Sequence, residues 1–425
     1  MSRFTRHFQQ VVGSPAVVRA VGEAFFFLGG FRRSSRSEPP PPDGKILVIK
    51  LDAVGDFVLA TPFLRELRGS FPRASITLIV RPSVLNLAET CPYVNEVRAF
   101  QCNHIVGKFL WLRRHWAALR YARQWLWPRR FDLAICPRWS ADRDHAAFLC
   151  YFSGAPRRVG ASEFVNAQKR EANRGYDRFF TELVEGSGAM HEVERNAQIL
   201  RAAGGRTRDD RCELWVTAED HRRAEELLAA LPARGESPLV ALGLGASMLR
   251  KVWPASSFAR LASELRRRTG ARFILIGGPG EEHLGATFCR DFPDPGVIDA
   301  IGKLTLRETF ALLRHCDLHI GNDSGPMHLA AAAGKSVVEI LPHSASGAAD
   351  ADGSPQRFAP WRVDQLILRP ASATPPCEQE CLADEPHCIL SVGVEQVLDA
   401  ALALIGENRK SRLVKPVAPI SLECS

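Results

Sequence analysis

CDLHIGNDSGPMHLAAAAGKSVVEILPH, residues 316–343, predicts a strand, a glycine-rich turn, a helix and a second strand. Pro326 suits the first helical turn, and Gly334 suits the residue after the helix. The turn directs free backbone N–H groups and the positive helix end toward one point, which favours a phosphate. Asp323, Ser324 and Gly325 form this turn, and His328 follows one helical turn later. An ordinary αβ unit with a well-capped helix would show the same pattern.

A second stretch, with an acid at the end of a predicted strand, lies near the start of the chain. Residues 45–52, KILVIKLD, predict a buried strand, and residues 58–68 have helical spacing of apolar residues. Asp56 lies in the turn between them, at the carboxyl end of the strand, where open α/β sheets bind their ligands. The competing interpretation is an aspartate that only caps the helix.

Three motifs occur in a fixed order, and their combination is more specific than any one alone. They are ILVIKLDAVGDFVLATPFLRELR from Ile46, GASMLRKVWP from Gly245 and GNDSGPMHLAAAAGK from Gly321. Together they resemble glycosyltransferase family 9, the ADP-heptose:lipopolysaccharide heptosyltransferases. The resemblance extends over residues 45–405.

The resemblance implies the GT-B fold, in which two Rossmann-like α/β domains face each other across a cleft. The acceptor would bind the first domain and the nucleotide sugar the second. Lys251 matches the family's lysine on the diphosphate side of the donor, and Ser247 stands where the family often has a hydroxyl. In families of this fold an acid after the second strand of this domain often holds the ribose. Glu281 and Glu282 both suit that position.

The composition excludes several classes of protein. The 425 residues are 46% hydrophobic and 24% charged, typical of a soluble protein long enough for two domains. No stretch reaches the roughly 18 uninterrupted apolar residues of a membrane span. The eleven cysteines are scattered, as in a reducing compartment. Gly243-Leu-Gly245 begins a dinucleotide fingerprint, but Met248 occupies the third glycine position, which excludes a dehydrogenase.

Positive charge indicates an anionic partner. The net charge is +8, and residues 108–130 hold four tryptophans and seven Lys or Arg without an acid. Tryptophan beside arginine suits a membrane–water boundary, and no nucleic-acid motif accompanies it. Residues 1–37 predict a basic amphipathic helix that lies on a membrane or packs on the protein body. We therefore expect a cytoplasmic protein that is peripheral to the inner membrane; a solvated basic face is the alternative.

Alternating strands and helices predict four segments. Residues 1–44 form a basic extension with a proline-rich linker, and residues 45–210 form the acceptor domain. Residues 211–392 form the donor domain, and residues 393–425 form a closing helix and tail. The helix would pack back on the first domain, as is usual in this fold. Residues 342–362, rich in Ser, Ala, Gly and Pro, are expected to be mobile.

Further basic residues and cysteines suggest two more sites. Lys50, Arg157 and Arg158 would hold phosphates of an acceptor glycolipid, although each is also an ordinary solvated residue type. A second group offers ligands for structural zinc or iron: Cys377, Cys381 and Cys388, with His387 adjacent. Some family members carry four cysteines here, and Ala373 and Thr374 lie near the place of the missing one. The sequence leaves open whether this group binds metal.

The expected reaction is glycosyl transfer with inversion. The resemblance implies that heptose is transferred from ADP-heptose to a lipopolysaccharide core or a related surface glycan. Asp56 would be the base that takes the acceptor proton. Lys251, Ser324 and Gly325 would hold the departing diphosphate, and Asp323 would orient the sugar. His328 would support the turn or contact the phosphate. No cofactor is expected in catalysis, because no Asp-x-Asp motif follows the strands of the cleft. Alternatives are an enzyme using another nucleotide sugar, a sugar-nucleotide epimerase, and a non-catalytic scaffold.

Overall fold

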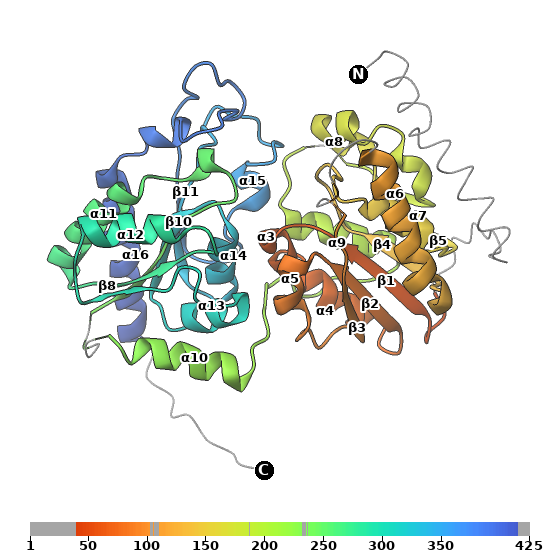
Figure 1. Ribbon diagram of the computed structural model, residues 1–425, viewed down its shortest axis with the longest axis horizontal. Coiled ribbons are helices and arrows are strands. Elements are labelled where there is room, and N and C mark those ends of the chain that lie inside the picture. The colour runs from red at the N-terminus through yellow and green to blue at the C-terminus, as the bar shows by residue number, and fades with distance from the viewer. Residues whose placement is uncertain are drawn as a thin grey trace, which may run out of the picture. The chain divides into compact units, whose positions relative to one another are not determined.

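The structure, a computed structural model, describes residues 40–414 except 103–104, 106–109, 187, 232–234 and 236. The chain divides into two compact units. Unit 1 runs to Trp215 and includes Ala349–Ala359, and unit 2 comprises Val216–Ala348 and the chain from Pro360. Each unit contains a parallel six-stranded sheet flanked by helices (Figure 1). The prediction of a two-domain α/β protein is confirmed, whereas the expected helix in residues 1–37 lies outside the described residues.

Unit 1 is built on a sheet in the order β3-β2-β1-β4-β5-β6. Its strands are β1 (Lys45–Lys50), β2 (Ser75–Val80), β3 (Glu96–Ala99), β4 (Leu133–Cys136), β5 (Arg157–Ala161) and β6 (Glu182–Val184). Its helices are α3 (Val54–Val58), α4 (Thr61–Ser70), α5 (Pro82–Ala88), α6 (Leu110–Tyr121), α7 (Ala146–Phe152), α8 (Ala167–Ala172), α9 (Glu192–Ala202) and α15 (Pro355–Phe358). β1 and β2 are continuous apolar runs, as expected for strands covered on both faces.

Unit 2 is built on a sheet in the order β12-β11-β10-β7-β8-β9. Its strands are β7 (Leu239–Gly243), β8 (Arg272–Ile276), β9 (Val297–Asp299), β10 (Leu318–Asn322), β11 (Ser336–Ile340) and β12 (Gln365–Leu368). Its helices are α10 (Ala218–Leu228), α11 (Ala255–Thr269), α12 (Glu282–Asp291), α13 (Leu306–Leu313), α14 (Gly325–Ala332) and α16 (Val394–Val414). Capping boxes begin α10 at Thr217 and α13 at Thr305, which fixes where these helices start.

Both sheets have the same doubly wound topology. Counted from the first strand of each unit, the order is 3-2-1-4-5-6, with all neighbours parallel. The strand order therefore reverses between β1 and β4 in unit 1 and between β7 and β10 in unit 2. In sheets of this topology, loops diverge at the carboxyl ends of the strands on either side of the reversal, and the crevice between them is the usual ligand position.

The last helix belongs to the core of unit 2. α16 contacts α11 and the strands β10, β11 and β12, all within that unit. Its buried side chains Val397, Leu398 and Leu404 join the apolar core there. The expectation that this helix also packs back on the first domain stays a prediction.

The segment expected to be mobile instead contains a buried arginine. Arg357, in α15, is fully buried within unit 1. Its guanidinium lies 2.6 Å from a carboxylate oxygen of Glu192 and 2.5 Å from one of Asp352, and it donates to Ser140. A buried guanidinium is retained only when its charge is compensated, as it is here. The composition of this segment, rich in small residues, gave no indication of this contact. The carboxylate of Asp352 is paired with Arg357.

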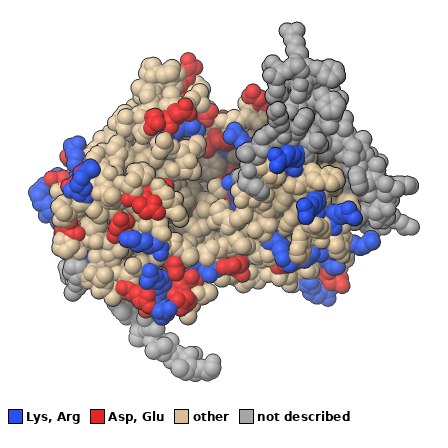
Figure 2. Space-filling view, viewed as in Figure 1, with Lys and Arg blue, Asp and Glu red and all other residues tan. Residues whose placement is uncertain are grey.

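In the tryptophan-rich segment, residues 110–129 are helical, but the type of helix changes along them. α6 continues into a π-helical turn, Ala122–Leu126, and a 3₁₀ turn, Trp127–Arg129. Trp116 is 64% exposed, and Trp125 is 40% exposed beneath the guanidinium of Arg98. Figure 2 shows Lys and Arg side chains gathered over the part of unit 1 that contains α6. Among the described residues, no helix combines the length and apolar character needed to cross a bilayer.

Candidate active site

The crevice at the carboxyl end of β1 holds a buried charge network. The ammonium group of Lys50 lies 3.0 Å from Asp52 and donates to the carbonyl of Pro137. Arg138, which follows β4, lies 3.2 Å from the other carboxylate oxygen of Asp52. Asp56 lies in the first turn of α3 and is half-buried beside this network. The loops after β1 and β4 thus bring two acids and two cations together at the point where the strand order reverses.

The two acids of this network have pKa values pushed in opposite directions. Burial raises the pKa of Asp56 to about 6, and the negative charge of Asp52 adds to the effect. Burial alone would also raise the pKa of Asp52, but Arg138 and Lys50 overcome it and lower that pKa below its usual value. Asp52 therefore stays ionised, and Asp56 titrates near neutrality. A carboxylate that gains and loses a proton near pH 6 is suited to general-base chemistry.

Arg138 contacts several groups at the carboxyl ends of these strands, although the sequence analysis did not identify it as a site residue. Its side chain is buried and donates to the carbonyls of Leu51 and Ala141. It also lies 3.1 Å from Asp144, which in turn lies 2.5 Å from Arg81. Its position directly after β4 was the available signal, since that strand is the neighbour of β1 at the crevice.

Three basic residues expected to bind acceptor phosphates are already engaged. Lys50 is only 3% exposed, so its ammonium group acts within the Asp52 network. Arg157 binds both carboxylate oxygens of Glu182 and the carbonyls of Ala202 and Ala203. Arg158 donates to the carbonyls of Phe179 and Ala155. These contacts hold the first domain together, so the structure does not favour the expected phosphate role.

Arg157 and Arg158 also lie at the opposite ends of the strands from Asp56. They begin β5, where Arg157 pairs with Leu133 and Leu133 pairs with Ile46. Lys50 lies four residues further along β1, or about 13 Å at roughly 3.3 Å per residue. The two arginines therefore sit near the amino ends of the strands, and Asp56 follows a carboxyl end. The structure therefore does not bring Arg157 and Arg158 together with Asp56.

The matching crevice of unit 2 contains a lysine–aspartate pair. The ammonium group of Lys251, in the loop after β7, lies 2.5 Å from a carboxylate oxygen of Asp323, which follows β10. Burial would lower the pKa of Lys251, but Asp323 raises it above its usual value, so the charge persists. Asn322 accepts a hydrogen bond from the backbone of Trp253 and donates to the carbonyl of Leu244. It thereby ties the Lys251 loop to β10.

Glu339 is a buried acid in this crevice that the sequence reasoning missed. It lies in β11, paired in register with Gly321 of β10, and is 1% exposed. Burial raises its pKa well above the usual value, and the charge of Asp323 raises it further. Burial therefore favours the protonated form of Glu339, and Asp323 is the direct ionic partner of Lys251. A single acid within an apolar strand, VVEI, gives little sequence signal for such a role.

The turn after β10 has the geometry expected of an anion site. Ser324 is the N-cap of α14, but its side chain forms no capping hydrogen bond. Its hydroxyl oxygen is buried and has no hydrogen-bond partner in the described part of the chain. Gly325 begins the helix, and His328 is buried on its next turn. The turn thus offers a free hydroxyl and the positive end of a helix beside Lys251.

The two candidate ribose acids occupy different places. Glu281 accepts a hydrogen bond from the amide of Gly278, and its carboxylate lies over Gly245. A Cβ atom at Gly245 would approach that carboxylate to 2.1 Å, so any larger residue there would displace the side chain of Glu281. Glu282 is exposed and accepts from the amide of Gly280. The structure therefore brings Glu281, rather than Glu282, to the loop that carries Lys251; Ser247 of that loop is exposed.

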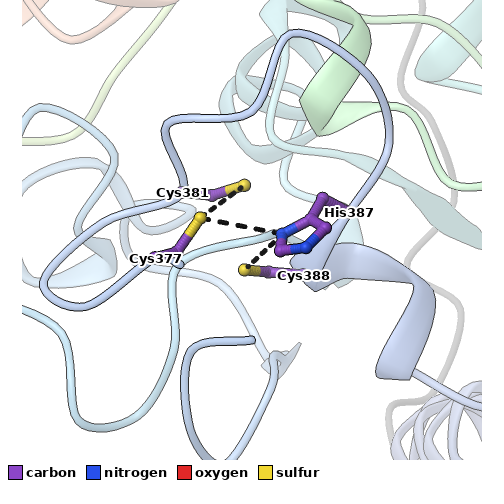
Figure 3. A group of neighbouring side chains, drawn as sticks. All are labelled: Cys377, Cys381, His387 and Cys388. Carbon is purple, nitrogen blue, oxygen red and sulfur yellow. Dashed lines mark hydrogen bonds between the residues drawn. The ribbon is translucent and has the colours of Figure 1, made fainter. Parts of the chain in front are cut away.

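A separate group in unit 2 brings together four potential metal ligands. Cys377, Cys381, His387 and Cys388 point toward one another, and their ligand atoms all lie within 4.8 Å (Figure 3). The Sγ atoms of Cys377 and Cys381 are 4.0 Å apart. The Nδ1 atom of His387 is 3.6 Å from Sγ of Cys377 and 3.4 Å from Sγ of Cys388. Ala373, near the place of the missing cysteine, packs against the three thiols.

These distances fit a tetrahedral metal site. With metal–sulfur bonds of about 2.3 Å and metal–nitrogen bonds of about 2.0–2.1 Å, the tetrahedron edges are about 3.8 Å between sulfurs and about 3.5 Å between sulfur and nitrogen. Three of the six separations, those given above, lie close to these edges, and the other three are at most 4.8 Å. Three thiolates and one imidazole suit zinc, and a sulfur-rich tetrahedron also suits iron. His387 supplies the fourth ligand that the cysteines alone do not.

Comparison with known proteins identifies the family. A sequence profile of glycosyltransferase family 9 (heptosyltransferase) matches residues 123–385, more than half of the chain. The chain belongs to glycosyltransferase family 9. As a member of this family it is a glycosyltransferase, and the predicted enzyme class is confirmed.

Relatives within family 9 cover most of the chain. Lipopolysaccharide heptosyltransferase 2 of Salmonella typhimurium is 25% identical over 76% of this chain and 88% of its own. Lipooligosaccharide heptosyltransferase 2 of Haemophilus influenzae is 30% identical over 69% of this chain and 82% of its own. Among solved structures, a family 9 glycosyl transferase from Veillonella parvula has a TM-score of 0.66 and 22% identity, covering 86% of this chain and 98% of its own. E. coli ADP-heptose lps heptosyltransferase II has a TM-score of 0.61 and 21% identity, covering 86% and 99%. These two structures establish the fold.

Proposed function

We propose that this protein transfers heptose from ADP-heptose to a sugar hydroxyl of a lipopolysaccharide core or a related surface glycolipid, with inversion at the anomeric carbon. Unit 1 supplies the base, and unit 2 binds the nucleotide sugar. Support for the donor comes from relatives named as heptosyltransferases and from a solved E. coli heptosyltransferase structure described with ADP. The reaction itself follows from the chemistry of the two crevices.

The observation that carries the proposal is the state of Asp56. Its pKa of about 6 leaves the carboxylate ionised at neutral pH and basic enough to take a proton. Among the described residues it forms no ion pair within 4 Å, whereas Asp52 beside it is paired with Lys50 and Arg138. The acceptor hydroxyl would give its proton to Asp56 as its oxygen bonds to the anomeric carbon. A binding scaffold would have no use for a carboxylate tuned in this way.

Unit 2 would stabilise the leaving group. As the anomeric carbon–oxygen bond breaks, negative charge grows on the ADP diphosphate. Lys251 would bind that charge, together with the hydroxyl of Ser324 and the N-terminal end of α14. Asp323 positions Lys251 before the donor arrives and would then orient the hydroxyls of the sugar. Burial favours the protonated form of Glu339, which would limit the negative charge near this pair.

The remaining donor contacts follow from the same geometry. The carboxylate of Glu281, above Gly245, would accept hydrogen bonds from the ribose hydroxyls, since it lies on the Lys251 loop. His328 is buried inside α14 and would support the turn from below. Lys251 and the helix end provide the positive charge that a divalent ion would otherwise supply, so we propose that transfer needs no metal.

We propose a structural role for the tetrahedral group of Cys377, Cys381, His387 and Cys388. All four positions of a tetrahedron are filled by protein atoms, so no position is left for substrate or water. Bound zinc or iron would crosslink this loop. The metal would therefore support the fold of unit 2, and the residues of the crevice would carry out transfer.

A peripheral position on the inner membrane surface is part of the proposal. Trp116 projects into solvent from α6, close in sequence to the exposed Trp125. Basic residues gather over the same part of unit 1 (Figure 2). Indole rings suit the headgroup region, and each basic residue near an anionic surface contributes about 1 kcal/mol. Attachment there would hold the enzyme near a glycolipid acceptor.

Transfer from purified ADP-heptose tests the proposed function. The protein is incubated with ADP-heptose and a heptose-deficient lipopolysaccharide core, and the product is read by mass spectrometry. UDP- and GDP-sugars serve as controls for the alternative donors, and the same mixtures without acceptor test for epimerised nucleotide sugar. Transfer from ADP-heptose alone supports the proposal. Transfer only from another nucleotide sugar, or epimerisation without transfer, contradicts it.

Flotation with liposomes tests the membrane contact. We expect binding to anionic vesicles at low salt, release at high salt and weaker binding of Trp116→Ala. Phe164→Ala is the matched control, since Phe164 is similarly exposed on a different surface loop. Equal binding to neutral vesicles, or no effect of Trp116→Ala relative to the control, contradicts the proposed surface.

A further inference from the structure

The tetrahedral cysteine–histidine group lies next to the loop that carries Lys251. Cys388 begins the short 3₁₀ turn η6, Cys388–Ser391, which contacts the 3₁₀ turn η5, Leu249–Lys251. Cys388 and Ile389 are fully buried, and Ile389 belongs to the main apolar core of unit 2. A crosslink at Cys388 therefore bears directly on the loop that holds Lys251.

A hydrogen bond connects the two turns at one buried side chain. The indole N–H of Trp253 donates to the carbonyl of Val392, directly after η6, over 2.9 Å. Trp253 is 1% exposed, and its ring packs edge-on against Phe258. It follows Lys251 by two residues, and its backbone amide is held by Asn322. The Lys251 loop thus has one anchor on β10 and another on the chain that continues from the cysteine group.

The same group also contacts the loop after β11. Gln379 lies between Cys377 and Cys381, and its carbonyl accepts a hydrogen bond from the amide of Ala348 over 3.2 Å. Gly347 is packed so closely there that a Cβ atom would lie 2.6 Å from that carbonyl oxygen. The loop after β11 continues directly from the strand that contains Glu339. Two loops of the donor crevice therefore rest on the segment that the metal would crosslink.

We propose that metal bound by Cys377, Cys381, His387 and Cys388 positions the Lys251 loop for the donor diphosphate. The inference rests on the proposed function only in naming that ligand. Without the crosslink, residues 377–388 lose the four-way connection that fixes η6. The carbonyl of Val392 then no longer holds Trp253 in place, and the loop samples conformations in which Lys251 is withdrawn from Asp323. The four ligands are positioning residues that act through Trp253.

The test compares four purified proteins: the native chain, His387→Ala, His387→Cys and His283→Ala. His387→Cys preserves four ligands, and His283→Ala removes an exposed histidine from α12 of the same unit. Metal content is measured by mass spectrometry, amide hydrogen exchange is followed in residues 244–253, and ADP affinity is measured by calorimetry. Hydrogen exchange reports on the loop whether or not ADP binds.

We expect about one metal ion per chain in the native protein, His387→Cys and His283→Ala, and loss of metal from His387→Ala. In His387→Ala, exchange at residues 244–253 should quicken and ADP affinity should fall about tenfold, within the usual range for coupled sites. Metal-free native protein, or His387→Ala with unchanged exchange at 244–253, overturns the inference. If ADP binds none of the proteins while the exchange difference persists, the proposed function fails and the inference about the loop stands.

Discussion

The two crevices have the same topology and opposite electrostatic designs. In unit 1, Asp56 lies beside a charge network that satisfies Asp52, and its own pKa rises to about 6. In unit 2, the acid after the fourth strand, Asp323, is paired directly with Lys251 at 2.5 Å. One crevice therefore presents a carboxylate that can accept a proton, and the other presents a fixed cation beside a helix N-terminus.

The difference lies in which loop supplies the cations. In unit 1 the cations Lys50 and Arg138 are buried at the strand ends and neutralise Asp52, so the acid further along the chain has no direct partner. In unit 2 the cation lies in the loop itself and reaches the acid of the turn. The same strand order can thus build a base or an anion site, depending on where one lysine is placed.

Asp56→Asn should have the largest effect on transfer. Loss of general-base help typically costs about 10²–10⁴ in rate, and the asparagine keeps the size of the side chain. We expect ADP affinity to stay within about twofold, because unit 2 holds the nucleotide. Steady-state transfer assays with calorimetry on the same preparation measure both quantities. Asp43→Asn, an exposed aspartate ahead of β1, is the control. If Asp56→Asn keeps a transfer rate within a few-fold of the native rate, Asp56 is not the base.

Lys251→Ala should weaken ADP binding by a smaller amount. Charge-assisted hydrogen bonds contribute about 1.5–3 kcal/mol, so the dissociation constant should rise about 10- to 100-fold. Lys303→Ala provides the matched control, since Lys303 is an exposed lysine of the same unit. Calorimetry with ADP decides the result. Equal affinities for the two variants would mean that the anion site of unit 2 lies elsewhere.

Glu281→Ala and Glu282→Ala should differ in their affinity for ADP. The difference should be smaller than the effect of Lys251→Ala. We expect the first to weaken ADP binding by about tenfold, as for a lost hydrogen bond of about 1 kcal/mol or slightly more, and the second to leave it unchanged. The contrast depends on the carboxylate of Glu281 lying over Gly245. Titration with ADP and with adenine, which lacks the ribose, separates a ribose contact from a general effect. A larger loss in Glu282→Ala would reverse the assignment.

The sequence predicted those parts of the fold that depend on local pattern. The apolar strands, the loops after β1, β7 and β10, and the residues Asp56, Lys251 and Asp323 were all found from motifs. β5 was missed because it begins with Arg157 and Arg158, which looked like a surface charge patch rather than a strand. Only strand pairing shows that these arginines lie at the amino ends of the strands.

Long-range contacts explain the remaining failures. Arg138 lies in a loop and Glu339 in an apolar strand, and the importance of each depends on partners far away in the sequence. Arg357 is buried against Glu192 although its segment has the composition of a mobile loop. His387 was noted beside the cysteines. Only the structure shows that its Nδ1 atom lies as far from two of the thiols as two ligands of one metal ion would lie from each other. Local sequence pattern does not contain this information.

The pH dependence of transfer tests the central claim, that Asp56 is a titrating base, most directly. The base must be ionised, so kcat/KM should be constant above the pKa of Asp56 and fall about tenfold per pH unit below pH about 6. Lys50→Met should move this limb to higher pH, because the charge of Lys50 lowers the pKa of Asp56, and Lys45→Met, at the exposed start of β1, should not. The residual activity of Asp56→Asn should lack the limb. A native profile without a limb near pH 6, or a limb that survives in Asp56→Asn, would contradict the account.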